Sequence, residues 1–161
     1  MKNITVYSGP MCAFCDAAKR LLGRNNLAYK EIDISTDPSL MDEMIKKAGG
    51  KRTIPQIFFE DYHVGGYQEL RELEKNGKIK NAKHVPRGML EFWIDPKSPY
   101  YRDYFNSNNK FIFYCASGWR SSLASKTALE MGLINVLNLE NGIDDWIKQN
   151  GPIEKITIKK N

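Results

Sequence analysis

The stretch ITVYSGPMCAFCDAAKRLLGR, residues 4–24, decides the fold of the first half of this chain. Ile4–Ser8 is rich in β-branched and aromatic residues and is followed by Gly-Pro, which predicts a strand that stops abruptly. Cys12–Arg24 carries apolar residues at helical spacing, which predicts a helix. The Cys-x-x-Cys pair, Cys12 and Cys15, therefore lies where a strand passes into a helix.

The rest of the first half continues as alternating elements. Further strands are expected at Tyr29–Ile34, Ile54–Phe59 and Tyr62–Gly65, with helices opening at Asp37 and over Tyr67–Asn76. The order β-α-β-α-β-β-α calls for one parallel strand pair with a right-handed crossover, followed by an antiparallel hairpin. A C-x-x-C at the first strand–helix junction of such a unit is typical of the thioredoxin-like fold.

The two cysteines have the spacing of a redox pair. A helix N-terminus favours the thiolate of Cys12 through unpaired N–H groups and the helix dipole, and the thiolate is the attacking form. Cys15, one turn further on, can attack a mixed disulfide on Cys12 and release the reduced product. The alternative is half of a zinc site, which needs a second Cys/His pair. His63, His84 and Cys115 are isolated in sequence, so we predict no metal site.

Residues 1–80 resemble a dithiol glutaredoxin over its full length. The matching text is Val6-Tyr7-Ser8, Cys12-x-Phe14-Cys15, Thr53-Ile54-Pro55-Gln56 and Gly65-Gly66-Tyr67. The resemblance implies that Pro55 is cis and faces the cysteines, and that the backbone of Ile54 binds the cysteine part of glutathione.

The resemblance also implies the remaining contacts to glutathione. Gln68 and Glu69 would hold its γ-glutamyl end, and Lys51 and Arg52 its glycine carboxylate. The expected binding residues are therefore Phe14, Lys51, Arg52, Thr53, Ile54, Pro55, Gly65, Gly66, Tyr67, Gln68 and Glu69. The chain departs from the family in having Gly9 where a lysine is common, and Gln68 in place of one of two acidic residues. A plain Gly-Gly turn and a strand-edge proline are the alternative interpretations of two of these motifs.

The pattern of residues 81–161, the second half of the chain, predicts another α/β unit. Asn81–Pro99 contains three prolines and is expected to be irregular. Lys110–Tyr114 predicts a buried strand, and Val136–Leu139 a second, short one. Helices are expected over Ser121–Met131 and Ile143–Gln149.

Cys115-Ala116-Ser117-Gly118-Trp119-Arg120-Ser121 joins the expected strand to the expected helix. Such a loop directs its N–H groups inward and forms an anion-binding nest. Arg120 adds fixed positive charge, and Cys115 would be held as a thiolate or carry a persulfide. A buried structural cysteine is the alternative.

The second half resembles a rhodanese-type sulfurtransferase. Residues 82–88 (AKHVPRG) and 141–146 (NGIDDW) also match that family. Related cysteine phosphatases use C-x5-R, whereas Cys115 and Arg120 are separated as C-x4-R, which favours sulfur chemistry. The opening strand, helix and Asp-x-Arg strand of a rhodanese are missing. Because two strands rarely form a stable sheet alone, this partial domain requires support from the first half, another chain or a rearrangement.

Composition limits the remaining classes. The net charge is +5, but lysines alternate with acidic residues, so we expect no nucleic-acid partner. No apolar run approaches a membrane span, and no signal peptide is recognised, which predicts a cytoplasmic protein.

Two functions follow from the sequence. We expect a glutathione-dependent thiol–disulfide oxidoreductase acting through Cys12 and Cys15 on protein or small-molecule disulfides. Cys115 and Arg120 would add a sulfurtransferase site fed by a sulfane-sulfur donor. The alternative, which we do not favour, is a [2Fe–2S]-binding glutaredoxin with a degenerate rhodanese-like interaction module. The sequence sets no oligomeric state.

Overall fold

The computed structural model describes residues 3–106 and 108–155, so the outermost residues of both predicted domains lie outside it. The chain divides into two compact units, each considered by itself. Among the described residues, the first unit comprises the chain as far as Gly77, then Asn81–His84, and Lys155. The second takes Lys78–Lys80 and Val85–Glu154.

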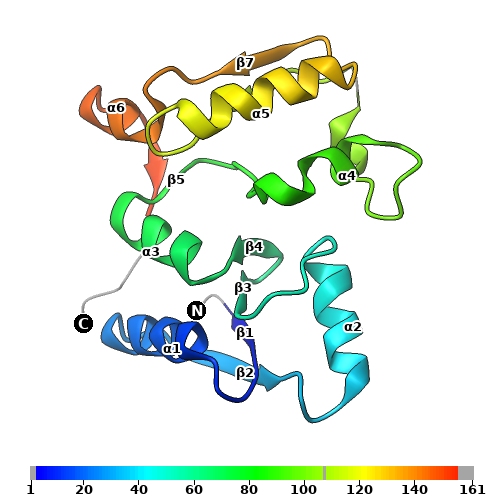
Figure 1. The fold of residues 1–161 in the computed structure, drawn as a ribbon. Coiled ribbons are helices and arrows are strands. Elements are labelled where there is room, and N and C mark those ends of the chain that lie inside the picture. The colour runs from blue at the N-terminus through cyan, green and yellow to red at the C-terminus, as the bar shows by residue number, and fades with distance from the viewer. Residues whose placement is uncertain (1–2, 107, 156–161) are drawn as a thin grey trace. The chain divides into compact units, whose positions relative to one another are not determined.

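The first unit is built on a four-stranded mixed sheet (Figure 1). Its strands are β1 (Ile4–Ser8), β2 (Tyr29–Asp33), β3 (Gln56–Phe59) and β4 (Tyr62–Gly65), in the order β2-β1-β3-β4. The β1–β2 pair is parallel, and the β1–β3 and β3–β4 pairs are antiparallel. This is the thioredoxin-like arrangement expected from the sequence, and the fold-class prediction is confirmed.

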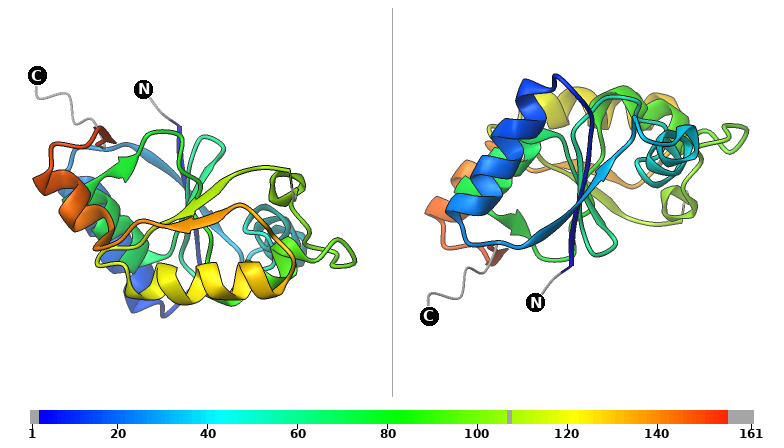
Figure 2. Two further views of the ribbon diagram at one scale, coloured as in Figure 1. Left: turned by 90° about the horizontal axis from the view of Figure 1, so that it is seen from above. Right: turned by 90° about the horizontal axis from the view of Figure 1, so that it is seen from below.

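Helices cover both faces of that sheet, because successive side chains of a strand point to opposite sides. They are α1 (Ala13–Arg24), α2 (Pro38–Lys47) and α3 (Tyr67–Asn76). Val6 and Ile57 pack in one cluster with residues of α1 and α3. Tyr7 and Phe58 pack in a second cluster with Met44 of α2. Figure 2 shows α1 and α2 on opposite sides of β1 and β2.

The sheets of the second unit have two strands each, fewer than the sheet of the first unit. Strands β6 (Phe111–Phe113) and β7 (Val136–Asn138) form a parallel pair, on which α5 (Trp119–Glu130) packs. Helix α6 (Gly142–Lys148) follows. A separate antiparallel pair joins β5 (Lys78–Ile79) to β8 (Ile153–Glu154), and an ion pair between Lys78 and Glu154 accompanies it.

The expectation that Asn81–Pro99 is irregular is wrong in its middle. A 3₁₀ turn, η1 (Arg87–Met89), leads into α4 (Leu90–Ile94), and a second turn, η2 (Asp103–Phe105), follows. Their apolar residues form a core with α5, made of Met89, Leu90, Trp93, Ile94, Phe105, Ala124, Ala128 and Leu133. Burial of this apolar surface stabilises a helix too short to persist alone.

The expectation of a buried strand over Lys110–Tyr114 is also wrong. Ile112 is 59% exposed, and its register partner Leu137 is 48% exposed. One face of the β6–β7 pair packs against α5, and these two side chains belong to the other face.

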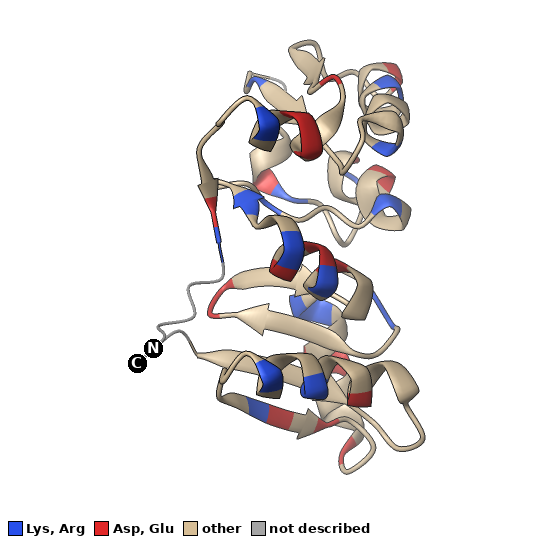
Figure 3. Ribbon diagram, turned by 90° about the vertical axis from the view of Figure 1, so that its left-hand side faces the viewer, with Lys and Arg blue, Asp and Glu red and all other residues tan. Residues whose placement is uncertain are grey.

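Charged residues of both signs occupy the same elements in each unit (Figure 3). Within the described part of the chain, no helix has the length and hydropathy of a membrane span.

Candidate active sites

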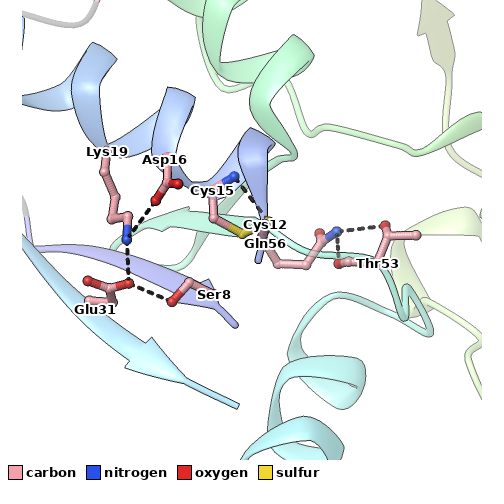
Figure 4. The surroundings of a disulfide bond; sticks show 8 residues. All are labelled: Ser8, Cys12, Cys15, Asp16, Lys19, Glu31, Thr53 and Gln56. Carbon is pink, nitrogen blue, oxygen red and sulfur yellow. Dashed lines mark hydrogen bonds and ion pairs between the residues drawn. A yellow bond between two sulfur atoms is a disulfide. The ribbon is translucent and has the colours of Figure 1, made fainter. Parts of the chain in front are cut away.

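Cys12 and Cys15 form a disulfide at the start of α1, with their Cα atoms 5.2 Å apart (Figure 4). Cys12 is the N-cap residue, and its Sγ accepts a hydrogen bond from the Cys15 N–H over 3.1 Å. The two sulfurs differ in access, because Cys12 is half-buried whereas Cys15 is 1% exposed. One cysteine can therefore meet a substrate while the other lies behind it.

A polar network near the disulfide was not found by sequence reasoning. The buried Ser8 hydroxyl at the end of β1 donates to Glu31 over 2.7 Å. Lys19 Nζ lies 2.9 Å from the same carboxylate and 3.3 Å from Asp16 (Figure 4). The Ser8 hydroxyl, together with Lys19, holds the pKa of Glu31 below its ordinary value. The parallel register of β1 and β2 brings Ser8 and Glu31 together, and α1 supplies Lys19 and Asp16. No local motif signals the contact between the strands and the helix.

The Thr53–Gln56 segment turns at a cis peptide bond between Ile54 and Pro55, as the resemblance implied. Gln56 is 2% exposed, and its Nε2 donates to the Thr53 carbonyl over 2.8 Å. Its Oε1 lies 2.7 Å from Nε2 of His63. The Gln56 amide therefore fixes the backbone of the segment from inside the unit.

The other expected glutathione contacts lie at the start of α3 and in the segment before Thr53. The Tyr67 ring stacks on Phe14, with centroids 6.1 Å apart. Glu69 Oε2 accepts the Gly66 N–H over 3.0 Å, so this carboxylate caps α3. Gln68 and Arg52 are exposed, and Lys51 is half-buried.

In the second unit, Cys115 lies two residues after the end of β6 with donors around its sulfur. The Gly118 N–H lies 3.2 Å from Sγ, and the Ser121 hydroxyl 3.5 Å. Burial raises the pKa of Cys115, but hydrogen bonds from Ser121, Gly118 and Ser117 outweigh it and bring the pKa below its ordinary value. The loop thus favours an anionic sulfur.

Two family profiles match the chain. The profile described as glutaredoxin matches residues 4–64, and that described as a rhodanese-like domain matches residues 55–149. Glutaredoxin 1 of Rickettsia prowazekii is 40% identical over 89 residues, which are 54% of this chain and 94% of that protein.

The chain belongs to the glutaredoxin family and carries a rhodanese-like domain. Both resemblances are confirmed. Glutaredoxins are thiol–disulfide oxidoreductases, so the chain belongs to a family of such enzymes.

Two further relatives extend the comparison. Glutaredoxin 1 of Rickettsia conorii is 44% identical over 49% of this chain and 78% of its own length. A solved structure from Rhodopseudomonas palustris, described as a protein of unknown function and possible tyrosine phosphatase, is 53% identical with a TM-score of 0.51. That match covers 53% of this chain and 64% of the other, so the chain spans less than two thirds of it.

The rhodanese-like loop directs N–H groups at the sulfur, as expected, and adds a hydroxyl donor that was not expected. Gly118 and Ser121 donate to Cys115 Sγ, whereas Arg120 is an exposed residue in the first turn of α5. Trp119 is 81% exposed beside it. Ser121 is 3% exposed and was not among the catalytic candidates. Its position six residues after the cysteine, in the first turn of the following helix, is the signal that could have identified it.

The described residues offer no cluster of metal ligands. Among residues 3–106 and 108–155, no three His, Cys, Asp or Glu side chains are grouped to hold a metal ion. A [2Fe–2S] cluster stays the alternative that we do not favour.

Proposed function

We propose that the glutaredoxin unit is a glutathione-dependent thiol–disulfide oxidoreductase in which Cys12 is the nucleophile and Cys15 the resolving thiol. The observation that carries this assignment is the difference in access between two cysteines already close enough to bond. The reduced Cys12 thiolate attacks the glutathione sulfur of a mixed disulfide, which releases the substrate thiol. Cys15 then attacks Cys12 Sγ and releases glutathione, and two further glutathione molecules reduce the resulting disulfide to give glutathione disulfide.

Three cysteine variants test this assignment. Cys12→Ser should abolish reduction of the mixed disulfide between glutathione and 2-mercaptoethanol. Cys15→Ser should keep that reaction, because free glutathione can itself attack the mixed disulfide on Cys12 and release glutathione disulfide. The same variant should lose reduction of protein disulfides that lack glutathione. Cys115→Ser should keep both reactions and is the control. Turnover by Cys12→Ser would overturn the assignment.

The proposed glutathione site combines backbone and charge. The backbone of Ile54 beside cis-Pro55 would hold the cysteine part of glutathione, and Arg52 and Lys51 its glycine carboxylate. Because Glu69 already accepts the Gly66 N–H, it would bind the γ-glutamyl amine through its remaining acceptor sites.

Charge reversal tests this binding site. Arg52→Glu should raise KM for the glutathione mixed disulfide about tenfold with little change in kcat, equivalent to about 1.4 kcal/mol of binding. Arg24→Glu, at the opposite end of α1 from Cys12, is the matched control. Equal KM values for the two variants would contradict the proposed site.

For the rhodanese-like unit, we propose that Cys115 carries sulfane sulfur as a persulfide. The support is a lowered thiol pKa together with N–H and hydroxyl donors directed at Sγ. The thiolate attacks the outer sulfur of thiosulfate and releases sulfite, and an acceptor such as cyanide then takes the outer sulfur as thiocyanate. Arg120 would attract the anionic donor.

Two assays separate this proposal from its rivals. The wild type should form thiocyanate from thiosulfate and cyanide, and Cys115→Ser should not. Hydrolysis of p-nitrophenyl phosphate, without thiocyanate formation, would instead favour the phosphatase chemistry suggested for the Rhodopseudomonas palustris protein. Absence of both activities would favour an interaction module.

A further inference from the structure

The loop that holds Cys115 is bound from outside by the turn at Asn141–Asp144, where α6 begins. The Ile143 N–H donates to the Cys115 carbonyl over 2.8 Å, and the Asp144 N–H to the Ala116 carbonyl over 3.1 Å. Within a trans peptide group, the carbonyl and the following N–H point in opposite directions. Fixing the Ala116 carbonyl toward Asp144 therefore directs the Ser117 N–H the other way, and that N–H is one of the donors that lower the pKa of Cys115.

This arrangement depends on a glycine at position 142. Gly142 has φ +66°, and a Cβ added there would lie 2.3 Å from the carbonyl oxygens of both Cys115 and Ala116. Neither oxygen belongs to a side chain that could rotate away. Gly118 also packs closely on the turn, because a Cβ added there would lie 3.0 Å from the Asn141 nitrogen. Loop and turn therefore pack backbone against backbone.

We propose that the Asn141–Asp144 turn is a positioning element for Cys115, and that Gly142 is the residue that allows it to hold the loop N–H groups toward Sγ. The inference rests on the proposed role of Cys115 as the sulfur carrier, because it specifies what keeps that sulfur anionic. Gly142 touches neither sulfur nor substrate in this role and acts only through the loop backbone.

The experiment uses the full chain with the Cys12–Cys15 disulfide intact, which leaves Cys115 as the one free thiol of the three cysteines. The rate of alkylation by iodoacetamide is measured against pH for the wild type, Gly142→Ala and Gly132→Ala. Gly132 is a matched control, because its φ is +98° and a Cβ there would meet nothing within 4 Å.

Gly142→Ala should move the alkylation profile upward by about one pH unit, which is about a tenfold smaller thiolate fraction below the titration midpoint. Gly132→Ala should leave the profile unchanged. An unshifted profile in folded Gly142→Ala, or an equal shift in Gly132→Ala, would overturn the proposal.

A second variant covers the case in which Gly142→Ala does not fold, as judged by circular dichroism. Asp144→Pro removes the N–H that binds Ala116 and places proline in a first helical turn, where it is tolerated. An upward shift in this variant supports the proposal, and an unshifted profile overturns it. Persulfidation of wild-type Cys115 by thiosulfate, followed by mass spectrometry, tests the sulfur-carrying function separately, so the two can fail independently.

Discussion

The side-chain amide of Gln56 donates a hydrogen bond to the backbone carbonyl of Thr53 over 2.8 Å, from a position only 2% exposed. The other end of the same amide meets His63 Nε2 at 2.7 Å. Because Gln56 Oε1 can only accept, His63 donates from Nε2. A single buried side chain thus connects β4 to the segment that contains cis-Pro55.

Replacing Gln56 with leucine should weaken both stability and substrate binding. The Thr53 carbonyl and the His63 N–H lose their hydrogen bonds to Gln56. Each lost bond costs about 0.5–1.5 kcal/mol in the free energy of unfolding. KM for the glutathione mixed disulfide should rise more than kcat falls. The Thr53–Pro55 backbone, which the substitution disturbs, is proposed to bind the substrate but takes no part in the chemical step. Urea unfolding and steady-state kinetics measure the two effects. Gln149→Leu, at an exposed glutamine of the other unit, should stay within about 0.5 kcal/mol of the wild type.

Ser121→Ala should raise the pKa of Cys115, because the Ser121 hydroxyl helps to hold it below its ordinary value. Less thiolate is then present near neutral pH, and alkylation should slow about threefold or more. Because the pKa of Cys115 is lower in the folded chain than in the unfolded chain, the thiolate adds to the free energy of unfolding. This contribution is fully present above the pKa of the unfolded chain and is lost as pH falls through the pKa of the folded chain. Ser122→Ala, at the exposed neighbouring serine, should show neither change.

Leu22→Ala should destabilise the glutaredoxin unit by about 2–5 kcal/mol, because the side chain is fully buried and leaves a cavity. Leu123→Ala removes the same atoms from a leucine of α5 that is 65% exposed, and should cost little. Denaturant unfolding followed by circular dichroism distinguishes the two variants. Equal losses of stability in the two variants would contradict the assignment of Leu22 to the hydrophobic core that packs between the sheet and helices α1 and α3.

Glu31→Gln tests the network of Ser8, Glu31 and Lys19. The lowered pKa of Glu31 means that the ionised carboxylate contributes stability above its unfolded pKa, and that this contribution is lost as pH falls through the folded value. The stability difference between wild type and Glu31→Gln should therefore be larger at pH 7 than at pH 3. The effect should be small, because the side chain is 40% exposed. Glu140→Gln, in the other unit, controls for the loss of one negative charge.

Sequence reasoning located the elements of the glutaredoxin unit closely, because their signals are local. The strand Ile4–Ser8, the hairpin strand Tyr62–Gly65 and the helix Tyr67–Asn76 have the bounds predicted for them. The Cys12 cap and the Asp37 cap each fix a helix start within a few residues of sequence. Local chemistry of this kind is visible before the fold is known.

The features that sequence reasoning missed depend on tertiary packing. Leu90–Ile94 is too short to predict as a helix between two prolines, and its burial against α5 stabilises it. The pairing of Lys78–Ile79 with Ile153–Glu154 joins distant two-residue segments that carry no strand pattern. Within the Cys115 loop, the roles of Ser121 and Gly142 follow only from how the loop folds back.

The division of the chain into units has a practical consequence for cutting the gene. The backbone passes from the first unit to β5, returns for Asn81–His84 and then leaves again at Val85. A fragment that stops after Lys80 would lose His84, whose ring contacts His63 at a centroid distance of 5.7 Å. A fragment that begins at Asn81 would leave Ile153 without its strand partner Ile79. Separate expression therefore calls for overlapping fragments, the first extending through His84 and the second beginning at or before Lys78.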